Sequence, residues 1–264
     1  MPQKNQPIIT LTTDFGTQDW FVGTMKGVIL NIAPDVNIVD ITHEIPPGDI
    51  KAGAYALFAA YRFFPENTIH ISVVDPGVGS DRKPIAVKTK SYWFIAPDNG
   101  ILSYALINEE IEEIRLIENE KLMLKPTGTT FHGRDIFAPV AAHIAQRIDS
   151  SIIGKKLEQI ITINFPQSCF YENEISGEIL YIDRFGNAIT NIKFKNETDY
   201  YNFQVFIDEK PQAIVRRFYS EAAKGETVAV PGSSGFIEIA VRDGNAAKVL
   251  NLKPGKKVLI KRVY

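Results

Sequence analysis

Three apolar, strand-like runs of this chain each end in an aspartate that is followed by a turn containing glycine. The three aspartates are Asp14, Asp75 and Asp98. In an α/β sheet, the carboxyl ends of parallel strands border the crevice in which ligands bind. An aspartate before a glycine is also ordinary turn chemistry. Three acids at equivalent strand ends nevertheless predict a site for a polar small molecule at one edge of a sheet.

The chain up to about residue 165 alternates strand and helix patterns. Apolar residues recur at helical spacing over residues 19–32, and Pro34 ends that pattern. The expected helices are 19–32, 49–64, 100–108 and 137–148, and the expected strands are 8–13, 36–41, 68–75, 84–90, 92–96 and 113–118. This alternation of apolar strands with helices predicts a mostly parallel sheet that is covered on both faces.

From about residue 173 the pattern changes to short strands separated by turn signals. The expected strands are 174–182, 188–194, 204–207, 227–230, 236–241 and 257–263. We therefore predict the α/β class, with an N-terminal α/β sandwich at 1–168 and a C-terminal all-β, barrel-like domain at 169–264. The boundary is expected near residues 165–173.

Composition excludes several classes of function. The 264 residues carry a formal charge of −2, so the composition does not indicate a basic surface that would bind nucleic acid or an acidic membrane. The single cysteine, Cys169, excludes an internal disulfide framework. No apolar stretch approaches the roughly 20 residues that span a bilayer, and the polar start of the chain does not read as a signal peptide. Cytoplasm is the expected compartment.

Two separated segments carry residues suited to acid–base chemistry. Asp75 and Arg82 flank a turn containing Pro-Gly-Val-Gly, which could fold back and pair the carboxylate with the guanidinium. An ionised aspartate in a cleft can orient a water molecule or accept its proton, although a loop-stapling ion pair is the commoner outcome. His132 lies beside Gly133, which permits close approach of a ligand to the backbone, and Asp135 could cap the following helix.

Other chemistries find weaker support. Asp14, His43, Asp75, His132 and Asp135 would form a plausible metal-ligand set if they clustered, but no tight ligand spacing supports a metal. The chain has no GxSxG elbow and no P-loop, and its GVG turn lacks the rest of a dinucleotide fingerprint. Two loops in the C-terminal half, 183–187 and 231–235, could bind an amino acid or form ordinary hairpins.

The motifs resemble those of the S-adenosylmethionine hydrolases, also called SAM hydroxide adenosyltransferases, which are relatives of the fluorinating and chlorinating 5′-halo-5′-deoxyadenosine synthases. The resemblance covers nearly the whole chain, and the motifs are specific only together, in this order and spacing. They are TTDFG at 12–16, PDV at 34–36, DITH at 40–43, VDPGVG at 74–79, APDNG at 96–100, FHGRD at 131–135, DRFGN at 183–187 and SGF at 234–236.

The resemblance implies a role for each matching residue. The water-activating triad of the family falls on Asp75, Arg82 and His132, and the acid that holds the ribose hydroxyls falls on Asp14. Phe131, within the same motif as His132, is a further substrate-binding candidate. Halogenating relatives carry a tyrosine where this chain has Asp75, which disfavours a halogenase.

In the C-terminal domain, the resemblance places the acid for the methionine ammonium on Asp183 and the asparagine at the adenine edge on Asn187. The serine of the methionine carboxylate loop falls on Ser233, although Ser234 lies next to it and the register could slip.

The implied reaction is the hydrolysis of S-adenosylmethionine by attack of water at the ribose C5′, giving adenosine and L-methionine without metal or cofactor. The family assembles as a homotrimer with sites between subunits. Two alternatives stay open: a metal-dependent hydrolase of another nucleoside-type substrate, and a non-catalytic sensor that binds S-adenosylmethionine or adenosine.

Overall fold

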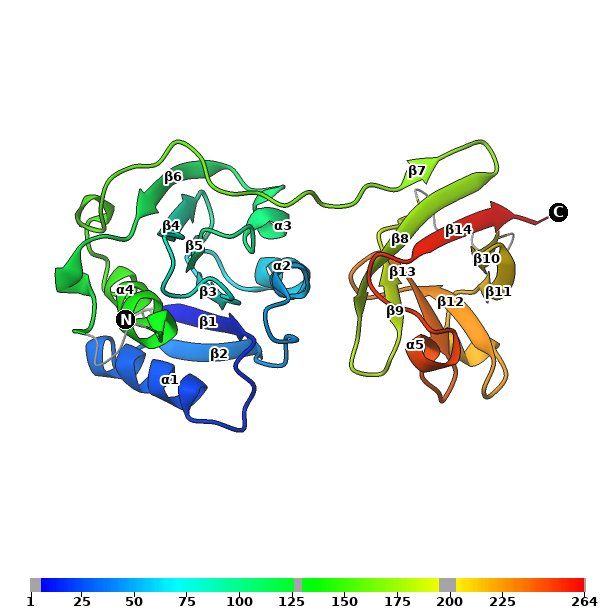
Figure 1. The fold of residues 1–264 in the computed structure, drawn as a ribbon, viewed down its shortest axis with the longest axis horizontal. Coiled ribbons are helices and arrows are strands. Elements are labelled where there is room, and N and C mark those ends of the chain that lie inside the picture. The colour runs from blue at the N-terminus through cyan, green and yellow to red at the C-terminus, as the bar shows by residue number, and fades with distance from the viewer. Residues whose placement is uncertain (1–5, 126–129, 195–202, 264) are drawn as a thin grey trace, which may run out of the picture. The chain divides into compact units, whose positions relative to one another are not determined.

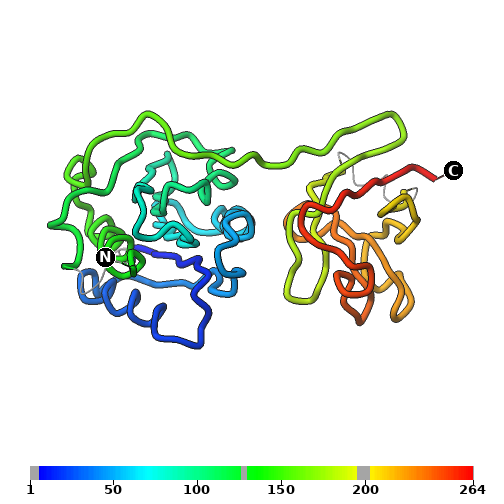
Figure 2. The backbone as a smooth tube through the Cα atoms, viewed as in Figure 1, coloured from blue at the N-terminus to red at the C-terminus, as the bar shows by residue number. Residues whose placement is uncertain are grey.

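In the computed structural model, the chain forms two compact units, Met1–Asn164 and Phe165–Tyr264. The structure describes residues 6–125, 130–194 and 203–263. The chain passes once from the first unit into the second (Figure 2). Each unit encloses a hydrophobic core of its own. Among the described residues, no helix has the length and apolar character needed to cross a membrane.

The first unit is built on a six-stranded sheet in the order β2-β1-β3-β5-β4-β6 (Figure 1). The strands are β1 (Ile8–Thr13), β2 (Asn37–Thr42), β3 (Ile69–Val73), β4 (Pro84–Thr89), β5 (Trp93–Pro97) and β6 (Ile111–Leu116). β1 runs parallel to β2 and β3, and β3 runs parallel to β5, whereas β4 is antiparallel to both of its neighbours. The mostly parallel sheet is therefore confirmed, and β1, β3 and β5 end at one edge.

Helices cover both faces of this sheet (Figure 1). The helices are α1 (Phe21–Ile32), α2 (Ile50–Ala60), α3 (Ser103–Leu106) and α4 (Ala138–Ala145). α1 and α4 pack together over one face, where Met25, Ile29 and Phe137 are fully buried. α2 packs with α3 on the other. The side chain of Asp49 caps α2 by accepting the backbone N–H of Ala52 at 3.0 Å.

Two expected helices differ from the structure in instructive ways. The helix expected at 100–108 is reduced to the four residues of α3, because Gly100 takes a left-handed φ of +94°. The helix expected at 137–148 begins earlier, with one wide π-helical turn at Gly133–Phe137, and ends at Ala145. Such π turns occur often at functional sites, and this one begins directly after His132.

The second unit is an antiparallel-rich barrel. Its strands are β7 (Cys169–Phe170), β8 (Glu174–Ile182), β9 (Ala188–Thr190), β10 (Phe203–Ile207), β11 (Lys210–Val215), β12 (Thr227–Pro231), β13 (Ile237–Val241) and β14 (Lys257–Arg262), with the short helix α5 (Ala246–Val249). Seven strands close on themselves because β14 pairs with both β10 and β8, and β7 adds to the outside of β8. The expected barrel-like fold is confirmed.

Sequence reasoning missed strand β11. Hairpins with two-residue turns are usually signalled by Asn-Gly or Asp-Gly, but here Asp208 and Glu209 both take positive φ, at 50° and 63°. Pro211 also argues against a strand interior. The structure accommodates it at an irregularity of the β10–β11 pairing, where it lies opposite Phe206.

Candidate active site

A cavity of about 650 Å³ opens at the carboxyl ends of β1 and β3 in the first unit. It collects four of the eight site residues predicted from the sequence. Its lining comprises Asp14, Phe15, Phe21, Pro47, Gly48, Val73, Asp75, Pro76, Val78, Thr130, Phe131, His132 and Gly133. The cavity is therefore where the topology places ligands in parallel α/β sheets.

Asp75, Arg82 and His132 form one continuous hydrogen-bonded chain. Nε of Arg82 donates to both carboxylate oxygens of Asp75, at 3.0 and 2.9 Å, and Nη2 donates to Oδ2. Nη2 also donates to Nδ1 of His132. The Pro-Gly-Val-Gly turn thus folds back as the sequence suggested. A residue 50 positions further along joins the pair.

The protonation pattern of this chain follows from the groups in it. A guanidinium has five N–H donors and no acceptor, so Nδ1 of His132 must accept from Arg82. The proton of the neutral imidazole then resides on Nε2. The structure thereby presents His132 as a donor through Nε2 rather than as a free base.

The ion pair is well shielded from solvent. The side chains of Asp75 and Arg82 are 6% and 8% exposed, and the guanidinium lies 5.5 Å from the centre of the Phe137 ring. Among the described residues, Nη1 of Arg82 is buried without a hydrogen-bond partner. A buried unpaired donor is costly, and Arg82 is bonded to two residues that line the cavity, Asp75 and His132.

Asp14 follows β1 and borders the same cavity. Its Oδ2 accepts the backbone N–H of Gly48 at 2.8 Å. An ionised carboxylate has about four lone-pair sites, so this single bond leaves acceptor capacity for a ligand with paired hydroxyls.

Asp98, the third strand-end aspartate, does not enter the cavity. It is 6% exposed and its Oδ1 accepts the backbone N–H of Ile161 at 2.7 Å. Asp98 therefore holds the segment around Ile161 rather than a ligand. Its neighbour Asn99 matters indirectly, because its side chain donates to the carbonyl of Val74 at 2.8 Å and so holds the backbone just before Asp75.

An aromatic wall completes the cavity. Phe131 packs against Phe15 and Phe21, with ring centres 5.7 and 5.2 Å apart. A Cβ on Gly133 would approach the rings of Phe131 and Phe15 and the sulfur of Met25 at 3.1–3.2 Å. The glycine beside His132 therefore allows these rings to close together, and Phe131 is placed to contact a flat or apolar part of a ligand.

The remaining predicted residues lie in the second unit. Asp183 and Asn187 stand in the β8–β9 turn, where Oδ1 of Asp183 accepts the backbone N–H groups of Phe185 and Asn187 at 2.9 and 2.8 Å. Nδ2 of Asn187 donates to Oδ2 of Asp183 at 3.0 Å. Ser233 is exposed in the turn between β12 and β13. The described contacts join Asp183 to Asn187 but not to Ser233.

Glu238, on β13, is an acidic residue that the sequence did not single out. It is 6% exposed. Burial and the charge of Asp183 raise its pKa to about 7. In the alternating apolar and polar pattern of β13, a glutamate is expected to face solvent. The sequence therefore gave no signal that Glu238 is buried.

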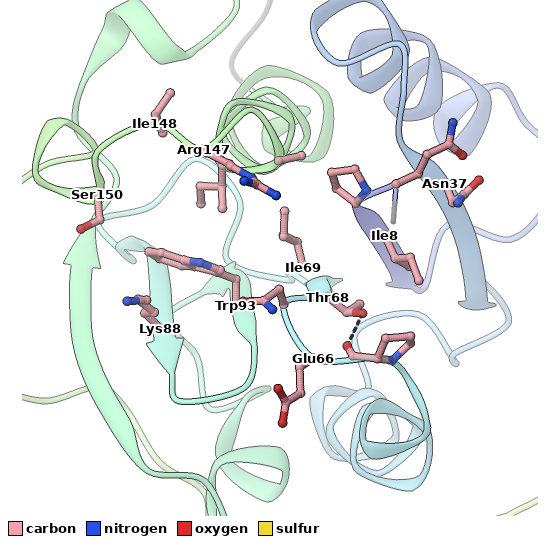
Figure 3. Close-up of a pocket in the computed structure, with 16 residues that line it drawn as sticks. Ile8, Asn37, Glu66, Thr68, Ile69, Lys88, Trp93, Arg147, Ile148 and Ser150 are labelled. Carbon is pink, nitrogen blue, oxygen red and sulfur yellow. Dashed lines mark hydrogen bonds between the residues drawn. The ribbon is translucent and has the colours of Figure 1, made fainter. Parts of the chain in front are cut away.

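A second cavity, of about 830 Å³, holds none of the predicted residues (Figure 3). It lies at the amino-terminal ends of β1, β2, β3 and β5, where Trp93, Lys88 and Arg147 border it. That edge is opposite to the one where parallel sheets bind ligands. Size alone therefore does not identify the candidate site.

The hypothetical metal set separates in the structure. Within residues 6–125, 130–194 and 203–263, no three His, Cys, Asp or Glu side chains are grouped to hold a metal ion. Asp135, for example, is paired with Arg134 through two hydrogen bonds of 2.6 and 2.9 Å.

Family comparison agrees with this two-unit architecture. Residues 9–154 match the SAM hydroxide adenosyltransferase N-terminal domain, and residues 177–259 match the C-terminal domain of the same family. The chain belongs to the SAM hydroxide adenosyltransferase family. The resemblance seen in the motifs is thereby confirmed.

Several relatives that match over nearly their full length carry the same activity name. The (R)-S-adenosyl-L-methionine hydrolase of Methanocaldococcus jannaschii is 39% identical, over 93% of this chain and 92% of that protein. The hydrolase of the same name from Thermus thermophilus is 35% identical, over 96% and 98%. Among solved structures, an uncharacterised conserved protein from Thermotoga maritima superposes with a TM-score of 0.90 at 38% identity, covering 97% of this chain and 100% of that one.

Proposed function

We propose that this protein hydrolyses S-adenosyl-L-methionine to adenosine and L-methionine by direct attack of water at the ribose C5′. The observation that carries the proposal is the buried Asp75–Arg82–His132 chain at the edge of a cavity, in a protein with relatives at 35–39% identity that are named S-adenosyl-L-methionine hydrolases.

The reaction needs little from an acid catalyst. The oxygen of water forms a bond to C5′ while the C5′–S bond breaks, and its electron pair stays on sulfur. The sulfonium therefore leaves as the neutral thioether of methionine, and the water loses one proton. The protein has to hold the water in line with the departing sulfur and favour the charge that develops on it.

The buried chain fits this task. Nη1 of Arg82 is a buried donor without a partner among the described residues, and Nε2–H is the remaining donor of His132. A single N–H donor would hold the water oxygen by one lone pair and leave the second lone pair to attack C5′. Asp75 fixes the guanidinium with its two carboxylate oxygens, borders the cavity and would accept the departing proton.

Substrate binding divides between the units in this proposal. Asp14 would bind the 2′- and 3′-hydroxyls of the ribose, and Phe131 would pack against the nucleoside. Asp183 would bind the methionine ammonium, Asn187 the adenine edge and Ser233 the methionine carboxylate. No cofactor or metal takes part.

We further propose a homotrimer in which each site takes Asp75 from one chain and Asp183 from a neighbour. Mixing tests this directly. Asp75→Ala and Asp183→Ala chains should each be inactive, and after co-refolding some sites would combine two intact partners and regain activity. If the mixture stays inactive although native mass spectrometry with one chain isotope-labelled shows mixed trimers, each site is built within one chain.

The decisive experiment is incubation of chelator-treated protein with S-adenosylmethionine in ¹⁸O-labelled water. Chromatography and mass spectrometry should find methionine and adenosine with the label at its 5′ oxygen. Activity that disappears on chelation and returns with metal would favour the metal-dependent hydrolase. Bound ligand without product over hours would favour the sensor. Either result would refute the proposal.

A further inference from the structure

A second histidine lies directly behind the Asp14 turn. His43 is 4% exposed, and its Nδ1 lies 2.8 Å from the hydroxyl of Thr13, the residue that precedes Asp14. The carbonyl of His43 accepts the backbone N–H of Gly16 at 2.7 Å. One residue thus holds the turn on both sides of Asp14, once with its ring and once with its backbone.

The sheet is distorted at the point where His43 leaves it. The parallel pairing of β1 with β2 slips between Leu11, opposite Asp40, and Thr12, opposite Thr42. Bulges of this kind re-aim side chains beside active sites. The slip coincides with the placement of the His43 ring against Thr13. Without the slip, the residues of β2 that follow it would have their side chains on the opposite face of the sheet.

The direction of the hydrogen bonds can be assigned. Nε2 of His43 lies 3.1 Å from the carboxylate of Asp40, off the axis of a good hydrogen bond. A carboxylate only accepts, so Nε2 carries the ring proton and Nδ1 accepts from Thr13 in the neutral ring. The Thr13 oxygen in turn accepts the backbone N–H of Phe15 at 3.3 Å.

A lysine ammonium anchors Asp40, which is the far end of the network that runs from Thr13 through His43. Nζ of Lys26 contacts Oδ2 of Asp40 at 2.6 Å. Partial burial raises the pKa of Asp40, but the bonds from Lys26 and His43 outweigh it, and the pKa lies below its ordinary value. Asp40 therefore stays an anion, which keeps the His43 ring in one tautomer.

We propose that His43, acting through the Thr13 hydroxyl, is a positioning residue that sets the Asp14 carboxylate for recognition of a ribose diol. Asp14 cannot adjust freely, because Gly48 binds its Oδ2 from the other side and Gly16 turns the chain with a φ of +66°. Small rotations of this turn would misplace one carboxylate oxygen relative to a sugar hydroxyl. The inference rests on the proposed role of Asp14 in substrate binding.

The sheet supplies a matched control. Thr10, on the same strand, bonds Nδ1 of His70 at 2.7 Å, and both residues are fully buried. This is the same Thr–His pair in the same sheet, but it lies among the rings of Tyr61, Tyr92 and Phe94 and does not touch the Asp14 turn.

The test compares the affinities for adenosine and 2′-deoxyadenosine by calorimetry. We expect wild type to prefer adenosine by about tenfold or more, because a charge-assisted hydrogen bond is lost with the hydroxyl. Thr13→Val and His43→Ala should reduce this preference to within about threefold. Thr10→Val should lower the melting temperature as Thr13→Val does and keep the preference. His43→Asn, whose side-chain oxygen can replace Nδ1 as acceptor, should retain more of the preference than His43→Ala.

The outcomes separate the inference from the proposed function. If Thr13→Val and His43→Ala keep the wild-type preference, or if Thr10→Val loses it equally, His43 is only structural. A wild type that hydrolyses S-adenosylmethionine but does not distinguish the two nucleosides also overturns the inference, and leaves the hydrolysis standing. A wild type that distinguishes them but releases no adenosine overturns the proposed function alone.

Discussion

The Asp75–Arg82 pair allows stability to be separated from catalysis. Both side chains are more than nine-tenths buried. Removing one member of a buried ion pair leaves an uncompensated charge and typically costs about 3–5 kcal/mol. Asp75→Asn keeps one acceptor oxygen for Arg82, so we expect a cost near 3 kcal/mol. Arg82→Met leaves the carboxylate without its donors and should cost about 3–5 kcal/mol.

The double variant tests whether these costs come from leaving one buried charge without its partner. Asp75→Asn with Arg82→Met removes both charges, so the free energy of unfolding that it loses should be well below the sum of the two single losses. We expect a coupling energy of about 2–4 kcal/mol, in the upper part of the range for residues in contact or beyond it. Hydrolysis should stay at least about 100-fold below wild type in all three variants, because each of them breaks the Asp75–Arg82–His132 chain that is proposed to position the water.

The assay is urea unfolding of the first unit, followed by intrinsic fluorescence and compared with initial rates of adenosine release. Thr10→Val serves as a control for a general loss of stability, since it weakens the same sheet away from the site. If the two single losses add within about 0.5 kcal/mol, the side chains do not interact as a buried pair. A double variant that regains activity along with stability would show that the pair only supports the fold.

Three further results are expected. Asp14→Ala should lower kcat/KM by about tenfold to 150-fold, the loss of a charge-assisted contact of about 1.5–3 kcal/mol, and an effect within threefold would refute the ribose role. His132→Ala should lower kcat by about 100-fold or more with little change in the affinity for S-adenosylmethionine, and a fully active variant would contradict the proposed triad. The pKa of Glu238 is raised from 4.5 to about 7, so the folded chain holds a proton that the unfolded chain releases. Stability should therefore fall as the pH rises from about 4.5 to about 7. Urea unfolding of Glu238→Gln across this range should show a flatter dependence, and an unchanged slope would disprove the assignment.

Much of the first unit could be predicted because proline and turn residues mark the ends of its helices and strands. Pro34 and the aspartate–glycine turns end elements where the structure ends them, and the apolar runs distinguish parallel strands. The sequence also predicted the Asp75–Arg82 fold-back, since a Pro-Gly-Val-Gly turn between opposite charges leaves few alternatives. Joining His132 to that pair rested on the resemblance. The link spans 50 positions, and local patterns hold no such information.

The parts that could not be predicted depend on tertiary context. Asp98 and Asp14 look alike in the sequence, but the N–H of Ile161 occupies the first and the cavity borders the second. His43 and His70 each bond a threonine of β1. One bonds Thr13 beside the Asp14 turn and the other bonds Thr10 within the core. His70 lies on β3 directly opposite Thr10, whereas His43 follows β2 beyond a slip in the β1–β2 register, and periodicity reveals neither partner.

The bond pattern around His132 also distinguishes two mechanisms of water activation. Arg82 cannot accept a proton, and it occupies Nδ1 of His132. If the ring serves as an acceptor that holds Arg82, an uncharged acceptor of similar reach should replace part of its function. If the ring takes the proton from water as a base, no amide can replace it.

His132→Asn tests this difference, because its Oδ1 lies close to the position of Nδ1 and does not titrate. We expect His132→Asn to be at least about tenfold more active than His132→Ala. If instead His132→Asn is as inactive as His132→Ala, the ring contributes more than an acceptor for Arg82, and proton transfer or the Nε2–H donor becomes its principal role.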